Sequence, residues 1–221
     1  RRVFCEIRYS ICGVRPASAA AVLAAVLTAF SAGAAPQWFK GNTHTHTTNS
    51  DGDSPPEDVI RWYRDHGYRL LVLSDHNVLT EPAKYAALVT PEFLLVAGEE
   101  VSDKFEKKPL HINALNLRSV IPPQGGTSVT DVLQRNVDAI RSQGAVPHVN
   151  HPNYHFAITA DELALLHHAR LFEVYNGHPK VENAGDAEHP SLETMWDRIL
   201  TGGGRLLGIA VDDAHNFKAW G

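Results

Sequence analysis

The sequence predicts an α/β fold with a mainly parallel sheet or barrel. Short apolar runs of strand length alternate along the chain with longer segments of helical periodicity. Several of the runs are apolar throughout, which is typical of strands that are covered on both faces. The chain has 221 residues, of which 43% are hydrophobic and 20% charged, so one globular domain with a sizeable core accounts for its length.

Seven runs are predicted to be strands and five segments to be helices. The predicted strands are Trp38–Asn42, Leu70–Leu73, Phe93–Ala97, His111–Leu117, Ala145–Val149, Leu171–Tyr175 and Leu206–Val211. The predicted helices are Pro56–His66, Glu81–Leu88, Ser128–Ser142, Thr159–His168 and Ser191–Leu200. Ser54 and Thr159 precede two of the helices as candidate N-caps. Gly67, Gly144 and Gly202 follow three of them as stop signals.

Residues 1–34 are predicted to be a secretory signal peptide, and residues 35–221 to be one domain. Residues 1–16 carry four arginines against one glutamate, Ala19–Phe30 is uncharged, and Ala32–Ala34 offers a cleavage site of the A-x-A kind. An uncleaved anchor is the alternative, but it needs about 20 apolar residues, and this run has 12. We therefore expect an exported protein, periplasmic or secreted, without a stable membrane anchor. Because the chain begins with Arg1 instead of Met, we expect its start to be a fragment or misassigned.

The composition excludes several classes of protein. The two cysteines, Cys5 and Cys12, both lie in the predicted leader, so a disulfide scaffold and a cysteine-based zinc module are excluded. Any metal in the domain must therefore be bound mainly by nitrogen and oxygen ligands. Without the leader the net charge is −8, which argues against a complex with nucleic acid. The sequence does not predict an oligomeric state.

Residues that can ligate metals follow most of the predicted strands. The segments are Thr43-His-Thr-His46 with Asp51, Ser74-Asp-His-Asn77, Gly98-Glu-Glu100 with His111, Asn150-His-Pro-Asn153 and Asp212-Asp-Ala-His215. His44 and His46 are two residues apart in an extended segment, so their side chains point to the same face and can bind one ion together. Each segment alone is a weak signal, because a histidine at a strand end is often only a hydrogen-bonded surface residue. In α/β barrels, however, the carboxyl ends of the strands form the rim where sites are built, so the set predicts a polynuclear metal site.

These motifs, in this order, resemble those of the PHP (polymerase and histidinol phosphatase) superfamily of metal-dependent hydrolases. The opening Asn42-Thr-His-Thr-His46, His151-Pro-Asn153 and Glu173-Val-Tyr-Asn-Gly177 are most similar to the exported CehA/McbA branch, which is carbaryl-hydrolase-like. The resemblance implies a distorted (β/α)7 TIM-like barrel with a trinuclear centre. It also implies three divalent metal ions, for which the ligands suit Zn, Mn or Fe.

The resemblance further implies which residues hold the ions. The first ion would be held by His44, His46, Glu100 and Asp213. Glu100 would bridge to a second ion held by His111 and His151, and the third would be held by Asp51, His76 and His215. The family patterns G-x-E and D-x-H select Glu100 over Glu99 and Asp213 over Asp212.

The chain departs from the family pattern in two places. Asn42 stands where the family usually has Asp, which weakens any carboxylate role at that position. The chain ends at Gly221, six residues after the last implied ligand, whereas family members usually continue with a further strand and helix. We therefore expect a barrel that is truncated, and open, at its C-terminal edge.

A site of this kind predicts hydrolysis by a metal-bound hydroxide. A phosphoesterase is the first expectation and a carbamate or ester hydrolase the alternative, since the ligands alone do not separate these small-molecule substrates. A non-catalytic periplasmic metal-binding protein is a third reading, although capture sequences tend to be low-complexity histidine tracts. His178, His155 and Lys180 are candidates for protonating a leaving group. Asp75 is expected to orient a ligand histidine.

Overall fold

The structure is a computed structural model that describes residues 37–218. The chain divides into two units, Arg1–Trp38 and Phe39–Gly221, and all the strands and helices named below belong to the second. The predicted signal peptide and its cleavage site lie outside the described residues. No helix within residues 37–218 is long and apolar enough to cross a membrane.

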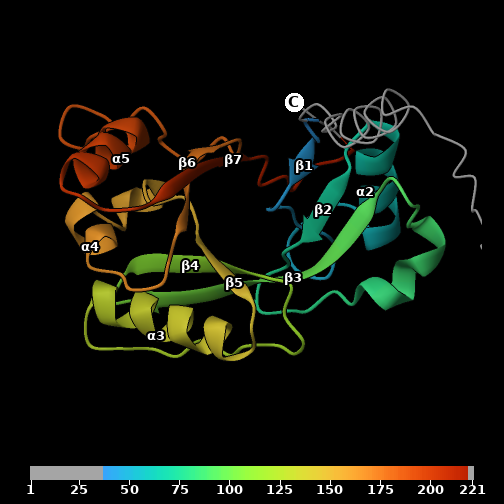
Figure 1. The fold of residues 1–221 in the computed structure, drawn as a ribbon, viewed down its shortest axis with the longest axis horizontal. Coiled ribbons are helices and arrows are strands. Elements are labelled where there is room, and N and C mark those ends of the chain that lie inside the picture. The colour runs from blue at the N-terminus through green and yellow to red at the C-terminus, as the bar shows by residue number, and fades with distance from the viewer. Residues whose placement is uncertain (1–36, 219–221) are drawn as a thin grey trace, which may run out of the picture. The chain divides into compact units, whose positions relative to one another are not determined.

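Seven strands form one sheet in which neighbours in the chain are also neighbours in space (Figure 1). They are β1 (Gly41–Asn42), β2 (Leu70–Leu73), β3 (Leu94–Phe105), β4 (Lys108–Leu115), β5 (Val146–Val149), β6 (Leu171–Asn176) and β7 (Leu207–Val211). All pairs are parallel except those of β4, which runs antiparallel to both β3 and β5. The predicted α/β class with a mainly parallel barrel is confirmed.

The two edges of the sheet meet at the carboxyl ends of the first and last strands. Thr45 forms a parallel bridge with Ala214. The backbone N–H of His46 donates to the carbonyl of Ala214, and that of Asp213 donates to the carbonyl of His44, each at 2.9 Å. The barrel is therefore nearly closed. Its C-terminal edge, which we expected to be truncated and open, is joined to the start of the domain at this rim.

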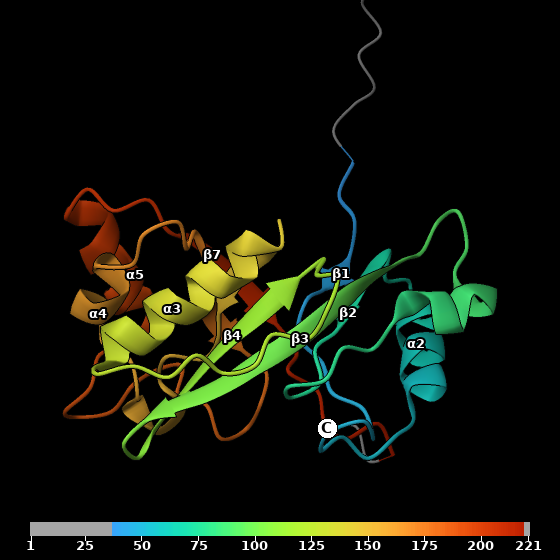
Figure 2. The ribbon, with the colours of Figure 1, turned by 90° about the horizontal axis from the view of Figure 1, so that it is seen from below.

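Helices cover the outer surface of the sheet (Figure 2). The α-helices are α2 (Pro56–Asp65), α3 (Val129–Ser142), α4 (Ala160–Ala164) and α5 (Leu192–Thr201), and the 3-10 helices are η1 (Pro82–Leu88) and η2 (Tyr154–Phe156). One apolar cluster joins α2 to β2. A larger cluster lies between the strands β3 to β6 and the helices α3, α4 and α5. Burial of these apolar faces places the helices outside and leaves the carboxyl rim free for polar residues.

Local signals set most of the helix ends. Thr159 caps α4 in a capping box with Glu162, as its position before the helix predicts. The prediction for Ser54 is wrong, because Pro55 is the N-cap of α2 and the Ser54 hydroxyl instead donates to Asp53. Helix α4 also ends four residues before the predicted His168, whose backbone has a φ of 65° that no α-helix continues.

Strand β3 is much longer than the apolar run that predicted it. It continues through the charged residues after Ala97 to Phe105 and forms a hairpin with β4. Glu100 therefore lies opposite Asn113 inside the hairpin and not in a loop after a strand. Because successive side chains on a strand point to opposite faces, Glu99 and Glu100 face different environments. The apolar run ended too early in the sequence because buried polar residues, Glu99 and Glu100, interrupt it.

Candidate metal centre

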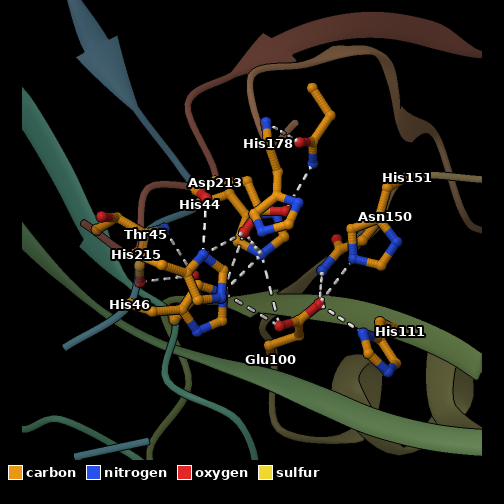
Figure 3. A network of polar contacts seen from close by, with 12 residues as sticks. His44, Thr45, His46, Glu100, His111, Asn150, His151, His178, Asp213 and His215 are labelled. Carbon is orange, nitrogen blue, oxygen red and sulfur yellow. Dashed lines mark hydrogen bonds and ion pairs between the residues drawn. The ribbon is translucent and has the colours of Figure 1, made fainter. Parts of the chain in front are cut away.

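All nine predicted ligands lie together at the carboxyl rim of the barrel. Figure 3 shows His44, His46, Glu100, His111, His151, Asp213 and His215. A cavity of about 210 Å³ opens there. Seven of the nine line it: His46, Asp51, His76, Glu100, His111, Asp213 and His215. His44 and His151 are buried, and both contact members of this set. The fold thus brings together side chains that are spread over about 170 residues of the sequence.

Four ligand atoms surround the most deeply buried part of the cluster. The Nε2 atoms of His44 and His46 are 3.1 Å apart, and they lie 3.1 and 3.2 Å from Asp213 Oδ1. Glu100 Oε2 is 3.5 Å from the first nitrogen and 3.3 Å from the second. Metal–ligand bonds of about 2.0–2.2 Å in a tetrahedron place neighbouring ligand atoms roughly 3.3–3.6 Å apart. The separations of these atoms are close to those that a divalent ion requires.

Two carboxylate oxygens in this group have no hydrogen-bond donor. Glu100 Oε2 and Asp213 Oδ1 are buried, and neither accepts a hydrogen bond from any described residue. An ionised carboxylate without a partner is costly to bury. Both oxygens are aimed at imidazole nitrogens, which bind metals in their neutral form. The residues present therefore fit divalent cations.

Two further groups of ligand atoms adjoin the first. Asp51 lies 3.4 Å from His215 Nε2 and 3.6 Å from His76 Nε2. On the other side, Glu100 Oε1 lies 3.0 Å from His111 Nδ1 and 3.2 Å from His151 Nε2. His46 Nδ1 also lies 3.5 Å from Asp51, so the two groups share residues with the first. The Nδ1 atom of His76 also lies 2.9 Å from Glu100, so this histidine faces two of the groups.

Burial and charge act against each other on these residues. Burial favours neutral His44, but the charges of Asp213, Glu173 and Glu100 raise its pKa well above the usual value. Burial likewise opposes ionisation of Glu100, yet the neighbouring His111 and His44 hold its pKa well below the usual value. Burial lowers the pKa of His76, but the nearby carboxylates of Asp51 and Glu100 outweigh it and raise this pKa to about 10. The buried carboxylates thus require positive charge, which either imidazolium groups or metal ions provide.

A buried carboxylate that the sequence reasoning missed supports the ligands from behind. Glu173 is fully buried on β6, and its Oε1 accepts from His44 Nδ1 at 2.6 Å. Its Oε2 accepts from the backbone N–H of His151 and from the side chain of Asn176, both at 2.7 Å. A carboxylate that accepts from a ligand histidine fixes the tautomer and orientation of its ring. The signal in the sequence was a glutamate within an otherwise apolar strand.

Two asparagines also contact the ligand carboxylates. The amide of Asn150 donates to Glu100 Oε1 at 2.8 Å, and the amide of Asn176 donates to Asp213 Oδ2 at 3.0 Å. Asn42 holds the first strand, since its side chain donates to the His44 carbonyl and accepts from the N–H of Asp212. These side chains leave one oxygen of each carboxylate free to face the cation site.

The four candidates for catalysis and ligand orientation have different environments. His178 and Lys180 line the cavity. His155 is exposed, packs against Tyr154 with ring centroids 4.4 Å apart and is absent from the cavity lining. Asp75 accepts hydrogen bonds from Thr47, Ser50 and Thr80, so it fixes the loop after the first strand. Its carboxylate reaches a ligand through Ser50, whose hydroxyl is 3.4 Å from His46 Nδ1, and its backbone carbonyl accepts from the N–H of Glu100 at 3.2 Å.

Replacing Glu173 by glutamine is expected to lower the metal affinity by about 10- to 100-fold. Both carboxylate oxygens of Glu173 accept hydrogen bonds, whereas glutamine offers one acceptor and would direct an N–H group at another donor. Metal titration of the purified variant, followed by elemental analysis, measures the effect. The exposed Glu193→Gln is the matched control, and equal metal affinity in the two variants would refute the role of Glu173.

The sequence has a partial match among characterised proteins. No protein-family model matches the chain. It is 28% identical over 153 residues to a 5′-3′ exoribonuclease of Haemophilus influenzae, which covers 67% of this chain and 54% of the relative. The chain therefore spans about half the length of the curated relative that it matches.

Several solved structures share the fold. A protein of Bifidobacterium adolescentis, predicted to be a metal-dependent phosphoesterase, has a TM-score of 0.57 and 14% identity, with 82% of this chain and 89% of that chain covered. A two-domain protein of Bacteroides vulgatus that contains a predicted PHP-like metal-dependent phosphoesterase has a TM-score of 0.55 and 20% identity, over 80% and 52% of the chains. An amidohydrolase of Chromobacterium violaceum has a TM-score of 0.56 and 17% identity, over 81% and 88%. At these identities the likeness shows the fold.

Proposed function

We propose that the protein is a metal-dependent phosphoester hydrolase of the PHP superfamily. The observation that carries the proposal is the pair of buried carboxylate oxygens, on Glu100 and Asp213, that face imidazole nitrogens and have no hydrogen-bond donor. Their place at the carboxyl rim of an α/β barrel is where such folds build active sites. The shared fold with proteins predicted to be metal-dependent phosphoesterases gives further support.

We propose that the nine ligands hold three divalent ions. Such ions, when bound, lower the pKa of a water ligand and offset the negative charge that develops on the substrate oxygens. Glu100 is suited to lie between two of them, because each of its oxygens faces different histidines. Glu173, Asn150 and Asn176 would hold the ligands in place during the reaction.

His178 is the best placed group for stabilising the leaving oxygen. Its Nδ1 accepts a hydrogen bond from the backbone N–H of Lys180 at 3.2 Å. The ring therefore carries its proton on Nε2 when it is neutral, and burial lowers its pKa, which favours that neutral form. Its ring packs edge to face with His215 at 5.0 Å between centroids. Nε2–H can donate to an oxygen bound in the cavity.

Hydrolysis assays test the proposal and its alternatives. The full chain, loaded with Mn²⁺ or Zn²⁺, is offered 4-nitrophenyl phosphate, bis(4-nitrophenyl) phosphate and a naphthyl carbamate. Turnover of a phosphate ester is expected. Turnover of the carbamate alone would overturn the phosphoester hydrolase proposal in favour of the carbaryl-hydrolase-like branch that the sequence resembles. Tight stoichiometric metal without turnover of any substrate would favour a metal-capture protein.

We also propose that the protein is exported and that its leader is removed. The support is the arrangement of charged, apolar and small residues in positions 1–34. Expression in a bacterium followed by periplasmic extraction and N-terminal sequencing is expected to yield a chain beginning at Ala35. A chain that stays in the cytoplasmic fraction with an intact leader would refute export.

A further inference from the structure

The cavity residues that are not proposed ligands have a distinctive composition. Eleven residues line the cavity, and seven of them are the proposed ligands named above. The other four are Tyr154, His178, Lys180 and Val181. Three of these four carry O–H or N–H donors, and none carries a carboxylate. The part of the wall that would face a substrate therefore offers hydrogen-bond donors and one full positive charge.

A hydrogen-bonded loop after β6 holds three of these four residues, His178, Lys180 and Val181. The backbone N–H and carbonyl of Asn176 bind the side-chain oxygen and nitrogen of Asn183, at 2.9 and 2.8 Å. Between them, Val181 is buried, and its N–H donates to the carbonyl of His178 at 3.1 Å. Two bonds of His178 hold its backbone and ring, since its N–H donates to Asn176 Oδ1 and its Nδ1 accepts from Lys180. These hydrogen bonds therefore fix the backbone of the loop and the ring of His178.

The ammonium of Lys180 has no counter-ion within residues 37–218. No described carboxylate forms an ion pair with it, although the ligand carboxylates lie in the same cavity. Those carboxylates face the imidazole nitrogens and would be neutralised by bound cations. An unpaired ammonium at the edge of such a cavity is suited to bind an anion that enters from solvent.

We propose that Lys180 makes the site selective for substrates with a terminal phosphate, the dianionic phosphate monoesters. The inference rests on the proposed phosphoester hydrolase function and names its substrate class. A phosphate monoester carries about −1.5 to −2 charge at neutral pH on three non-bridging oxygens, whereas a phosphate diester carries one negative charge on two. Lys180 binds the extra charge, Tyr154 offers a donor to another phosphate oxygen, and His178 faces the leaving oxygen.

Variants at Lys180 test this selectivity. The metal-loaded wild type is expected to hydrolyse 4-nitrophenyl phosphate with a higher kcat/KM than bis(4-nitrophenyl) phosphate. Lys180→Met, which keeps most of the stem and removes the charge, is expected to lower kcat/KM for the monoester by about 10- to 100-fold and that for the diester by less than about threefold. Lys180→Arg restores the charge and is expected to recover most of the monoester activity. Lys107→Met, in the turn between β3 and β4, is the matched control.

Phosphate binding gives a second measurement that does not depend on turnover. Calorimetry with inorganic phosphate is expected to show weaker binding to metal-loaded Lys180→Met than to the wild type, with the same metal content by elemental analysis. The proposed selectivity is overturned if Lys180→Met loses the same fraction of kcat/KM for both esters, or loses none. It is also overturned if the wild type prefers the diester. If the wild type hydrolyses neither ester, the proposed function fails. In that case the calorimetry alone decides whether Lys180 binds an anion.

Discussion

Replacing Glu100 by glutamine is expected to lower hydrolysis by at least about a thousandfold and to reduce the bound metal. Glu100 is fully buried, and its two oxygens lie within 3.5 Å of five imidazole nitrogens. The amide of glutamine removes one negative charge and directs an N–H group at nitrogens that must bind cations. Metal per chain by elemental analysis and kcat/KM for 4-nitrophenyl phosphate measure the two effects.

Glu99→Gln is the matched control for this substitution. Glu99 is also buried, but its Oε2 accepts from the backbone N–H of Ile121 at 2.9 Å, and it lies in none of the metal-binding groups. Metal content and activity are therefore expected to remain close to those of the wild type. Equal losses from both substitutions would mean that the assignment of Glu100 as the ligand is wrong.

The same control has an expected pH signature. Burial raises the pKa of Glu99 from 4.5 to about 7. Because the folded pKa lies above the unfolded one, ionisation destabilises the fold progressively as the pH rises from about 4.5 to 7. The full penalty of about 3 kcal/mol is present at pH 8. The free energy of unfolding is measured for both proteins at pH 4.5 and 8. The value for Glu99→Gln should rise relative to that of the wild type at the higher pH.

Removing the metal with a chelator is expected to abolish hydrolysis and to lower the melting temperature. Ligands bound only to the folded state stabilise it, by about 4 kcal/mol for an ion present at a thousand times its Kd. The ions would also join seven separated segments of the barrel rim and offset the buried charge of Glu100 and Asp213. Thermal unfolding before and after chelation measures the loss, and added Mn²⁺ or Zn²⁺ should restore the starting value.

The size of this loss is expected to depend on pH. Without metal, the buried carboxylates are compensated by protonated histidines, and the pKa values of His44, His76 and His151 are raised. Histidines with raised folded pKa values stabilise fully below about 6.5, and this stability is lost as the pH rises through the folded pKa. The drop in melting temperature on chelation should therefore be larger at pH 8 than at pH 6. A chelated protein that keeps its melting temperature and activity at pH 8 would contradict the metal centre.

The elements that could be predicted from the sequence depend on local signals. Apolar runs located β2 and β5 to within one residue, and the Thr159 cap located the start of α4, because strand burial and helix capping act over a few residues. The hairpin of β3 and β4 was missed, since its paired segment contains polar residues, including the buried Glu99 and Glu100, that interrupt the apolar pattern. Ser54 failed as a cap because the neighbouring Pro55 takes that position.

The sequence by itself determined the order of strands and helices and the types of side chain at the strand ends. Only the tertiary structure decided which atoms face one another: that Glu173 lies behind His44, that Asn150 holds Glu100, and that Lys180 lines the cavity without an ion pair. The physical reason is that hydrogen bonds and charges act over a few ångströms in space. His44 and Glu173 are 129 residues apart in the chain, and barrel closure alone brings them to 2.6 Å.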